Sequence, residues 1–118
     1  MKAINAYKSI EQSSLEEQVY SASPQKLILM LYNELIRSLK TLSLHPNDHK
    51  TAQHSVDIII ELIASLNEDI EITKDLRIIY DILIQWILLA RLHNDSIPID
   101  KCLDLILPIY EAWDEQFN

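Results

Sequence analysis

Glycine is missing altogether from this sequence of 118 residues. Proteins contain about 7% glycine on average, and glycine supplies the positive-φ positions of tight turns and of phosphate-cradling loops. Its absence argues against a β-rich fold and against a nucleotide-binding loop. Cysteine is nearly missing as well: Cys102 is the single one, so no internal disulfide can form, as expected in a reducing compartment.

Basic residues and long apolar runs are also scarce. Ten Lys and Arg stand against 18 Asp and Glu, which gives a net charge of −8. Nucleic acids and anionic membranes are bound by clustered Lys and Arg, whereas the basic residues here are scattered. Charged residues such as Arg77 and Asp81 interrupt the most apolar segment, and no signal peptide is recognisable. We therefore expect a soluble cytoplasmic protein without membrane insertion and without a nucleic-acid partner.

Helical periodicity is what the sequence does contain. Ser23 is a good N-cap, and Pro24 suits the first helical position. The apolar residues that follow recur at intervals of three and four, at Leu27, Ile28, Leu31, Leu35, Leu39 and Leu42. These features predict a helix over residues 24–42. The polar leader before it, residues 1–22, is predicted to be a loose segment or a short helix, which would be marginal alone.

Two more helices are expected after a turn at residues 45–48. Asn47 or Asp48 is predicted to cap the second helix, whose apolar spacing ends near Leu66. Thr73 is predicted to cap the third helix, with Asp75 favourably placed in its first turn.

The fourth helical pattern begins at Pro98 and contains a second proline. Pro108 lacks a backbone N–H and crowds the preceding turn, so we expect it to kink or split the helix near Leu107. Four amphipathic helices joined by short turns favour an all-α fold, an antiparallel four-helix bundle over residues 23–118.

The third helical pattern is apolar on nearly every side. Its core stripe is predicted at Leu76, Ile79, Leu83, Trp86 or Ile87, and Ala90. Around this stripe lie six more apolar residues: Ile78, Ile82, Ile84, Leu88, Leu89 and Leu92. Two interpretations remain open. The helix is either the central helix of a well-filled bundle, or it forms part of an apolar groove for a partner helix.

Patterns typical of catalytic or metal sites are weak. A di-iron bundle uses Glu-x-x-His, and no glutamate here has a histidine three residues later. His45, His49 and His54 cluster around a turn, where surface histidines are more common than a zinc site. We therefore predict no enzyme activity, no cofactor and no metal. His54 as the acceptor of a histidine phosphotransfer or signalling bundle is an alternative, and a generic helical adaptor is another.

Several short motifs resemble the flagellin export chaperones, the FliS family. They begin with Ser21-Ala22-Ser23-Pro24, followed by Leu27-Ile28 and Met30-Leu31-Tyr32, and upstream lies Asn5-Ala6-Tyr7-Lys8. Further motifs follow in the family's order: Glu61-Leu62-Ile63-Ala64-Ser65-Leu66-Asn67, Leu76-x-x-Ile79-Tyr80-Asp81 and Glu111-Ala112-Trp113. The chain departs from the pattern at Asn33-Glu34, Asp75 and Pro108.

The resemblance implies a non-enzymatic chaperone that binds the disordered C-terminal segment of flagellin in the cytoplasm. Such a chaperone prevents premature polymerisation and delivers flagellin to the flagellar type III export gate. In this family the N-terminal element can cover the groove when no client is bound, a role that falls here on Ile4 and Tyr7 of the leader. The residues expected at the groove and its cap are Ile4, Tyr7, Leu27, Met30, Tyr80, Ile84 and Leu88.

Overall fold

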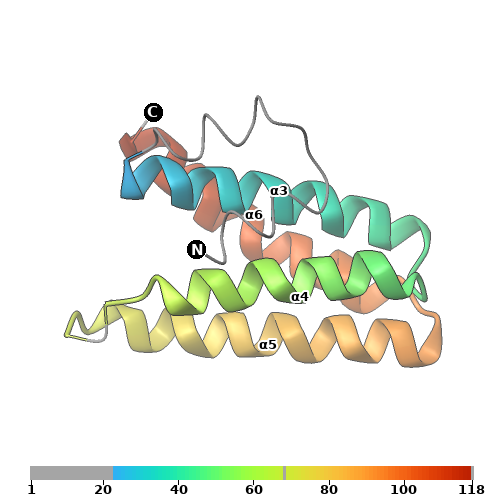
Figure 1. Cartoon of the computed structure of the whole chain (residues 1–118). Helices are drawn as coiled ribbons and strands as arrows, with labels where there is room; N and C mark the ends of the chain where they lie inside the picture. Colours follow the sequence, from blue (N-terminus) through green and yellow to red (C-terminus); the bar gives the residue numbers. More distant parts are fainter. Residues whose placement is uncertain (1–22, 68, 118) are drawn as a thin grey trace.

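The computed structural model describes residues 23–67 and 69–117, and this part of the chain forms four α-helices (Figure 1). They are α3 (Pro24–Leu44), α4 (His49–Ala64), α5 (Ile72–His93) and α6 (Ile97–Phe117). Within the described ranges there is no β-strand. The predicted all-α fold is confirmed, and the leader predicted at residues 1–22 lies outside the described residues.

The four helices form a closed ring. α3 packs against α4, α4 against α5, α5 against α6, and α6 returns to pack against α3. Successive helices run in opposite directions, so the start of α3 and the end of α6 lie at the same end of the bundle (Figure 1). α3 and α5 therefore stand at opposite corners of the ring, and so do α4 and α6.

Local side chains determine where the first two helices begin. The hydroxyl of Ser23 accepts a hydrogen bond from the backbone N–H of Lys26 at 3.2 Å. The Asp48 carboxylate accepts the backbone N–H of Lys50 at 3.2 Å and that of Thr51 at 3.5 Å. These bonds satisfy donors that have no partner inside the helix. The caps predicted at Ser23 and Asp48 are confirmed.

The start of α5 differs from the prediction. The helix begins at Ile72, so Thr73 lies inside the first turn and does not cap it. The Thr73 hydroxyl donates instead to the Ile70 carbonyl at 2.6 Å, because the turn before the helix brings that carbonyl within reach. At the other end, Asn94 adopts the left-handed conformation with φ 49°. Asparagine tolerates this conformation better than most residues, so it replaces the missing glycine.

Helix α6 continues through Pro108 without interruption. Of the two predicted outcomes, the split near Leu107 is therefore wrong, and the kink stays a prediction. Pro108 and Asp104, the residue whose carbonyl loses its helical donor, are both exposed. Water can hydrate this carbonyl on the outer side of the helix, so the lost backbone hydrogen bond leaves no buried group unsatisfied.

The core is built from one face of each helix. Its fully buried members include Leu35, Leu39 and Leu42 of α3, Ile58, Ile59 and Leu62 of α4, Leu83 and Ile87 of α5, and Ile99, Cys102 and Ile106 of α6. Cys102 donates its thiol to the Leu83 carbonyl at 3.8 Å, and burial raises the pKa of this thiol to about 12. The thiol therefore remains neutral and packs as a small apolar side chain.

Two tyrosines meet at the centre of this core. Tyr32 of α3 and Tyr80 of α5 join their hydroxyls in a hydrogen bond across the ring. Burial raises the pKa of both phenols, since the charged form would lose its hydration. The pair thus links the two opposite corners of the bundle without leaving a buried hydroxyl unpartnered.

Candidate functional site

Helix α5 exposes apolar side chains on the face that points away from the core. Ile78 is 58% exposed, Leu88 51%, Leu89 45% and Leu92 76%. α5 packs against α4 and α6 and occupies one corner of the ring (Figure 1). It is therefore not the central helix of the bundle, and its outer face is an apolar surface without a partner among the described residues.

The outer face of α5 has a regular order. Ile78, Ile82, Gln85, Leu89 and Leu92 follow one another at intervals of four, three, four and three residues. We call these five residues the outer row. Residues at such intervals share one side of a helix. Ile82 is half-buried and the other four are exposed, and Gln85 is the one polar member of the row.

Three of the residues expected at the groove lie on α5, one helical turn apart. Tyr80 is only 2% exposed and belongs to the core. Ile84 is half-buried, and Leu88 is about half-exposed on the edge of the helix beside the outer row. A partner can therefore touch Leu88 and part of Ile84, whereas Tyr80 supports this surface from below.

Leu27 and Met30 lie elsewhere. Both belong to the first two turns of α3, are half-buried and pack against the core. The start of α3 adjoins the end of α6, and α3 stands at the corner opposite α5 (Figure 1). The structure thus separates the expected site residues into two surfaces. Ile4 and Tyr7 lie outside the described residues.

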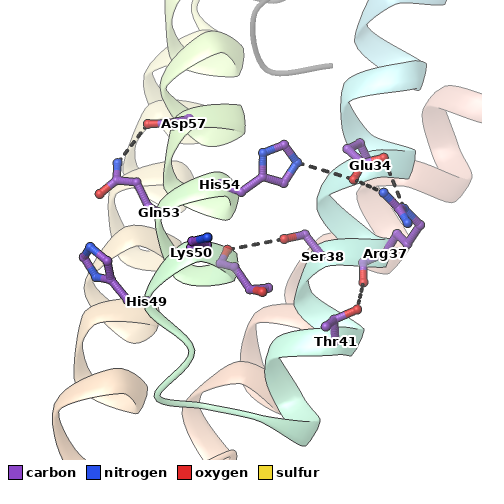
Figure 2. Close-up of a pocket in the computed structure, with 10 residues that line it drawn as sticks. Glu34, Arg37, Ser38, Thr41, His49, Lys50, Gln53, His54 and Asp57 are labelled. Carbon is purple, nitrogen blue, oxygen red and sulfur yellow. Dashed lines mark hydrogen bonds and ion pairs between the residues drawn. The ribbon is translucent and has the colours of Figure 1, made fainter. Parts of the chain in front are cut away.

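A polar pocket of about 570 Å³ opens between α3 and α4 (Figure 2). The Glu34 carboxylate accepts a hydrogen bond from the Arg37 guanidinium at 2.8 Å and lies 3.4 Å from Nε2 of His54. Burial by itself would raise the pKa of Glu34, but the hydrogen bonds from His54 and Arg37 outweigh it and lower the pKa. Deeper between the helices, the Ser38 and Ser55 hydroxyls hydrogen-bond to each other at 2.6 Å.

The geometry of this pocket does not favour chemistry at His54. The side chain of His54 is 15% exposed and its ring faces Glu34, whereas a phosphoacceptor histidine must be accessible to its donor. Across residues 23–67 and 69–117, no group of three or more His, Cys, Asp or Glu side chains could hold a metal ion. What the structure shows at this pocket is a set of polar contacts between α3 and α4.

Sequence reasoning missed both the pocket and the order of the outer row. Small polar residues inside apolar stripes, such as Ser38 and Ser55, were the available signal for the pocket. The alternating spacing from Ile78 to Leu92 was the signal for the row, and it was hidden because other apolar residues surround it.

The fold and this surface define a class of protein. An all-α bundle whose distinctive feature is an unpartnered apolar helix face is typical of proteins that bind other polypeptides. None of the described helices has a stretch long and apolar enough for a membrane span. Residues 5–118 match the family model described as flagellar protein FliS, and the chain belongs to this family.

Curated relatives agree with this assignment along nearly their whole length. The chain is 31% identical to the flagellar secretion chaperone FliS of Escherichia coli K12, over 98% of this chain and 91% of that protein. It is 32% identical to the protein of the same name from Salmonella typhimurium LT2, over 96% and 90% of the two chains. The resemblance drawn from the Ser23-Pro24 motif and its companions is confirmed.

Proposed function

We propose that this protein is a flagellar export chaperone that binds the disordered C-terminal segment of flagellin in the cytoplasm. By holding this segment it prevents premature polymerisation, and it delivers flagellin to the flagellar type III export apparatus. Membership in a family whose relatives are named flagellar secretion chaperones supports the general role. The observation that carries the binding function is the exposed apolar face of α5.

The physical basis is the burial of apolar surface. A disordered segment that folds into an amphipathic helix can lay its apolar side on α5. Each Å² of apolar surface removed from water contributes about 25 cal/mol. Ordering the client subtracts part of this gain, so the complex can be strong enough to protect flagellin and still release it at the export gate.

The second surface, at Leu27 and Met30, is the proposed site of the N-terminal cap. These two residues follow within two helical turns of Ser23, where the leader ends. The leader side chains Ile4 and Tyr7 are apolar, and we assign them the role of covering this surface when no client is bound. A long client segment can contact both surfaces and displace the leader from one of them.

Calorimetry with a peptide of the flagellin C-terminal segment tests the proposal. Each chain has one exposed α5 face, so we expect one peptide per chain and a negative heat-capacity change from apolar burial. Leu88→Ser should weaken binding by roughly three- to tenfold, because binding can bury only the exposed half of this leucine, while the melting temperature stays the same. Leu44→Ser is the matched control, because Leu44 is 76% exposed at the end of α3 and away from α5.

Two outcomes would contradict the proposal. An absence of detectable binding at micromolar concentrations would show that the C-terminal segment of flagellin is not a client of this chain. An equal loss of affinity in Leu88→Ser and Leu44→Ser would show that α5 is not the binding surface.

A further inference from the structure

The carboxylates of the polar pocket between α3 and α4 already have hydrogen-bond donors (Figure 2). The Glu34 carboxylate accepts a hydrogen bond from the Arg37 guanidinium at 2.8 Å. The Asp57 carboxylate accepts one from the side-chain amide of Gln53 at 2.9 Å. A cationic ligand would therefore have to compete with donors that the pocket itself supplies.

Two polar side chains that line the same pocket have no such partner. Within residues 23–67 and 69–117, the ring of His49 and the ammonium of Lys50 take part in no hydrogen bond or ion pair. Both side chains are exposed and belong to the first turn of α4. A cation in the first turn of a helix opposes the helix dipole, so the charge of Lys50 does not stabilise α4. The pocket thus holds a positive charge that its own structure does not use.

The charges of the described helices are unevenly distributed around the ring. α6 carries five carboxylates and one lysine: Asp100, Asp104, Glu111, Asp114, Glu115 and Lys101. α3 carries three cations and one carboxylate: Lys26, Arg37, Lys40 and Glu34. α4, with one lysine and two carboxylates, is nearly balanced. α6 stands at the corner opposite α4, so the pocket lies away from most of the negative charge, and its surroundings favour an anion.

We propose that this pocket is a docking site for a second polypeptide, an acidic segment whose carboxylates bind to Lys50 and His49. The ammonium of Lys50 and the ring N–H of His49 donate the hydrogen bonds. A carboxylate carries a single negative charge, so Glu34 and Asp57 repel it less than they repel a doubly charged phosphate. The chemistry of the pocket therefore favours aspartate and glutamate side chains.

The size of the pocket favours a polypeptide over a small organic acid. Its lining residues cover seven steps of α3, from Glu34 to Thr41, and eight steps of α4, from His49 to Asp57. These stretches are about 10–12 Å long, which is more than one carboxylate fills. A single exposed ion pair contributes little, whereas several carboxylates on one chain bind together. The docking site lies on α3 and α4 and the proposed client surface on α5, so the two can be tested separately.

An NMR titration of the isotope-labelled full chain with a short poly-Glu peptide tests the docking site. We expect the peptide to shift the backbone amide signals of the residues that line the pocket, above all those of His49 and Lys50. Added salt should reduce these shifts. A poly-Gln peptide of the same length tests whether the charge is needed. Free glutamate at the same carboxylate concentration tests whether a polypeptide is needed, and neither probe should cause comparable shifts.

A charge reversal at Lys50 tests the residue that we assign to the carboxylate. Lys50→Glu should raise the dissociation constant of poly-Glu roughly tenfold. A carboxylate suits the first turn of a helix, so the melting temperature should not fall. Lys101→Glu is the matched control, because Lys101 is exposed on α6, at the corner opposite α4. It changes the net charge by the same amount, and it should raise the dissociation constant by less than about twofold, since salt screens distant charges.

Four results would overturn the proposal. An absence of amide shifts with poly-Glu at millimolar concentrations would show that the pocket binds no acidic segment. Shifts of equal size with poly-Gln would show that carboxylates are not recognised. Equally tight binding of free glutamate would make the pocket a site for a small acid. An equal loss of affinity in Lys50→Glu and Lys101→Glu would show that only the net charge of the chain matters.

Discussion

At the scale of single residues, two hydroxyl pairs hold polar groups inside an apolar core. Tyr32 and Tyr80 link α3 to α5, and Ser38 and Ser55 link α3 to α4. All four residues are buried. A buried hydroxyl is tolerated only when it has a partner, so each pair fixes the relative position of its two helices.

The tyrosine pair gives a prediction about stability. Tyr80→Phe leaves the Tyr32 hydroxyl buried without its partner, and we expect a loss of about 1–3 kcal/mol in the free energy of unfolding. The double variant Tyr32→Phe/Tyr80→Phe removes both hydroxyls and should be nearly as stable as the natural chain. Urea unfolding of the single and double variants measures this. Losses that simply add in the double variant would contradict a coupled pair.

The same pair predicts a dependence on pH. Burial raises the pKa of both tyrosines above their ordinary value of 10.0. The folded chain therefore holds these protons more tightly than the unfolded chain does. The contribution of the two protonated tyrosines to the free energy of unfolding is fully present below pH 10 and is lost as the pH rises further. The Tyr32→Phe/Tyr80→Phe variant should therefore unfold at a higher pH than the natural chain when the pH is raised.

At the scale of elements, α5 is the helix on which both the core and the binding surface depend. Its inner face contributes Tyr80, Leu83 and Ile87 to the core, and its outer face carries the exposed apolar residues. The polar Asp81 and Gln85 are too few to make the outer face hydrophilic. An exposed apolar surface of this kind is typical of a site for another polypeptide, which is the role we propose for it.

Substitutions on the two faces of α5 should therefore separate stability from binding. Leu83→Ala removes part of a fully buried side chain and should lower the free energy of unfolding by about 2–5 kcal/mol. Leu88→Ser changes a side chain that is half in water, so melting should be nearly unchanged. Thermal and urea unfolding of both variants measure the difference. Unfolding of the chain by Leu88→Ser would show that this residue belongs to the core.

At the scale of the whole molecule, the four described helices close a ring among themselves. α6 returns to α3, so residues 24–117 form a complete bundle. A closed bundle of this size is expected to fold cooperatively by itself. Regulation is the role that we propose for Ile4 and Tyr7 of the leader.

Deletion of residues 1–10 tests that role. We expect the bundle to melt cooperatively, as the natural chain does, and the binding of an apolar dye to rise, because the surface at Leu27 and Met30 loses its cap. Client affinity should change as well: it rises if the leader only competes and falls if the leader also folds over bound flagellin. Unchanged dye binding, oligomeric state and affinity together would identify the leader as an inert tail.

The sequence by itself determined the features that depend on neighbours along the chain. Periodic apolar residues and the absence of glycine specified four helices and no sheet, and Ser23 and Asp48 specified two of the helix starts. The cap predicted at Thr73 and the split predicted as one outcome at Pro108 were wrong. The Thr73 hydroxyl donates to the Ile70 carbonyl inside the first turn, and water outside the bundle can satisfy the carbonyl that Pro108 leaves without a donor.

Only the tertiary structure decided whether the outer side of α5 is covered, whereas the core side was already predicted, since Leu83, Ile87 and Ala90 of the predicted stripe are fully buried. The sequence of α5 is apolar around most of its circumference, so it left open whether the helix is central in the bundle or exposes an apolar side. Packing against α4 and α6 buries Tyr80 with Leu83 and Ile87 and leaves Ile78, Leu89 and Leu92 outside. The hydrophobic effect has no direction of its own. The outer side stays exposed because α5 packs against α4 and α6 at a corner of the ring, and its inner side is joined to α3 by the hydrogen bond between Tyr80 and Tyr32, two residues that are 48 positions apart.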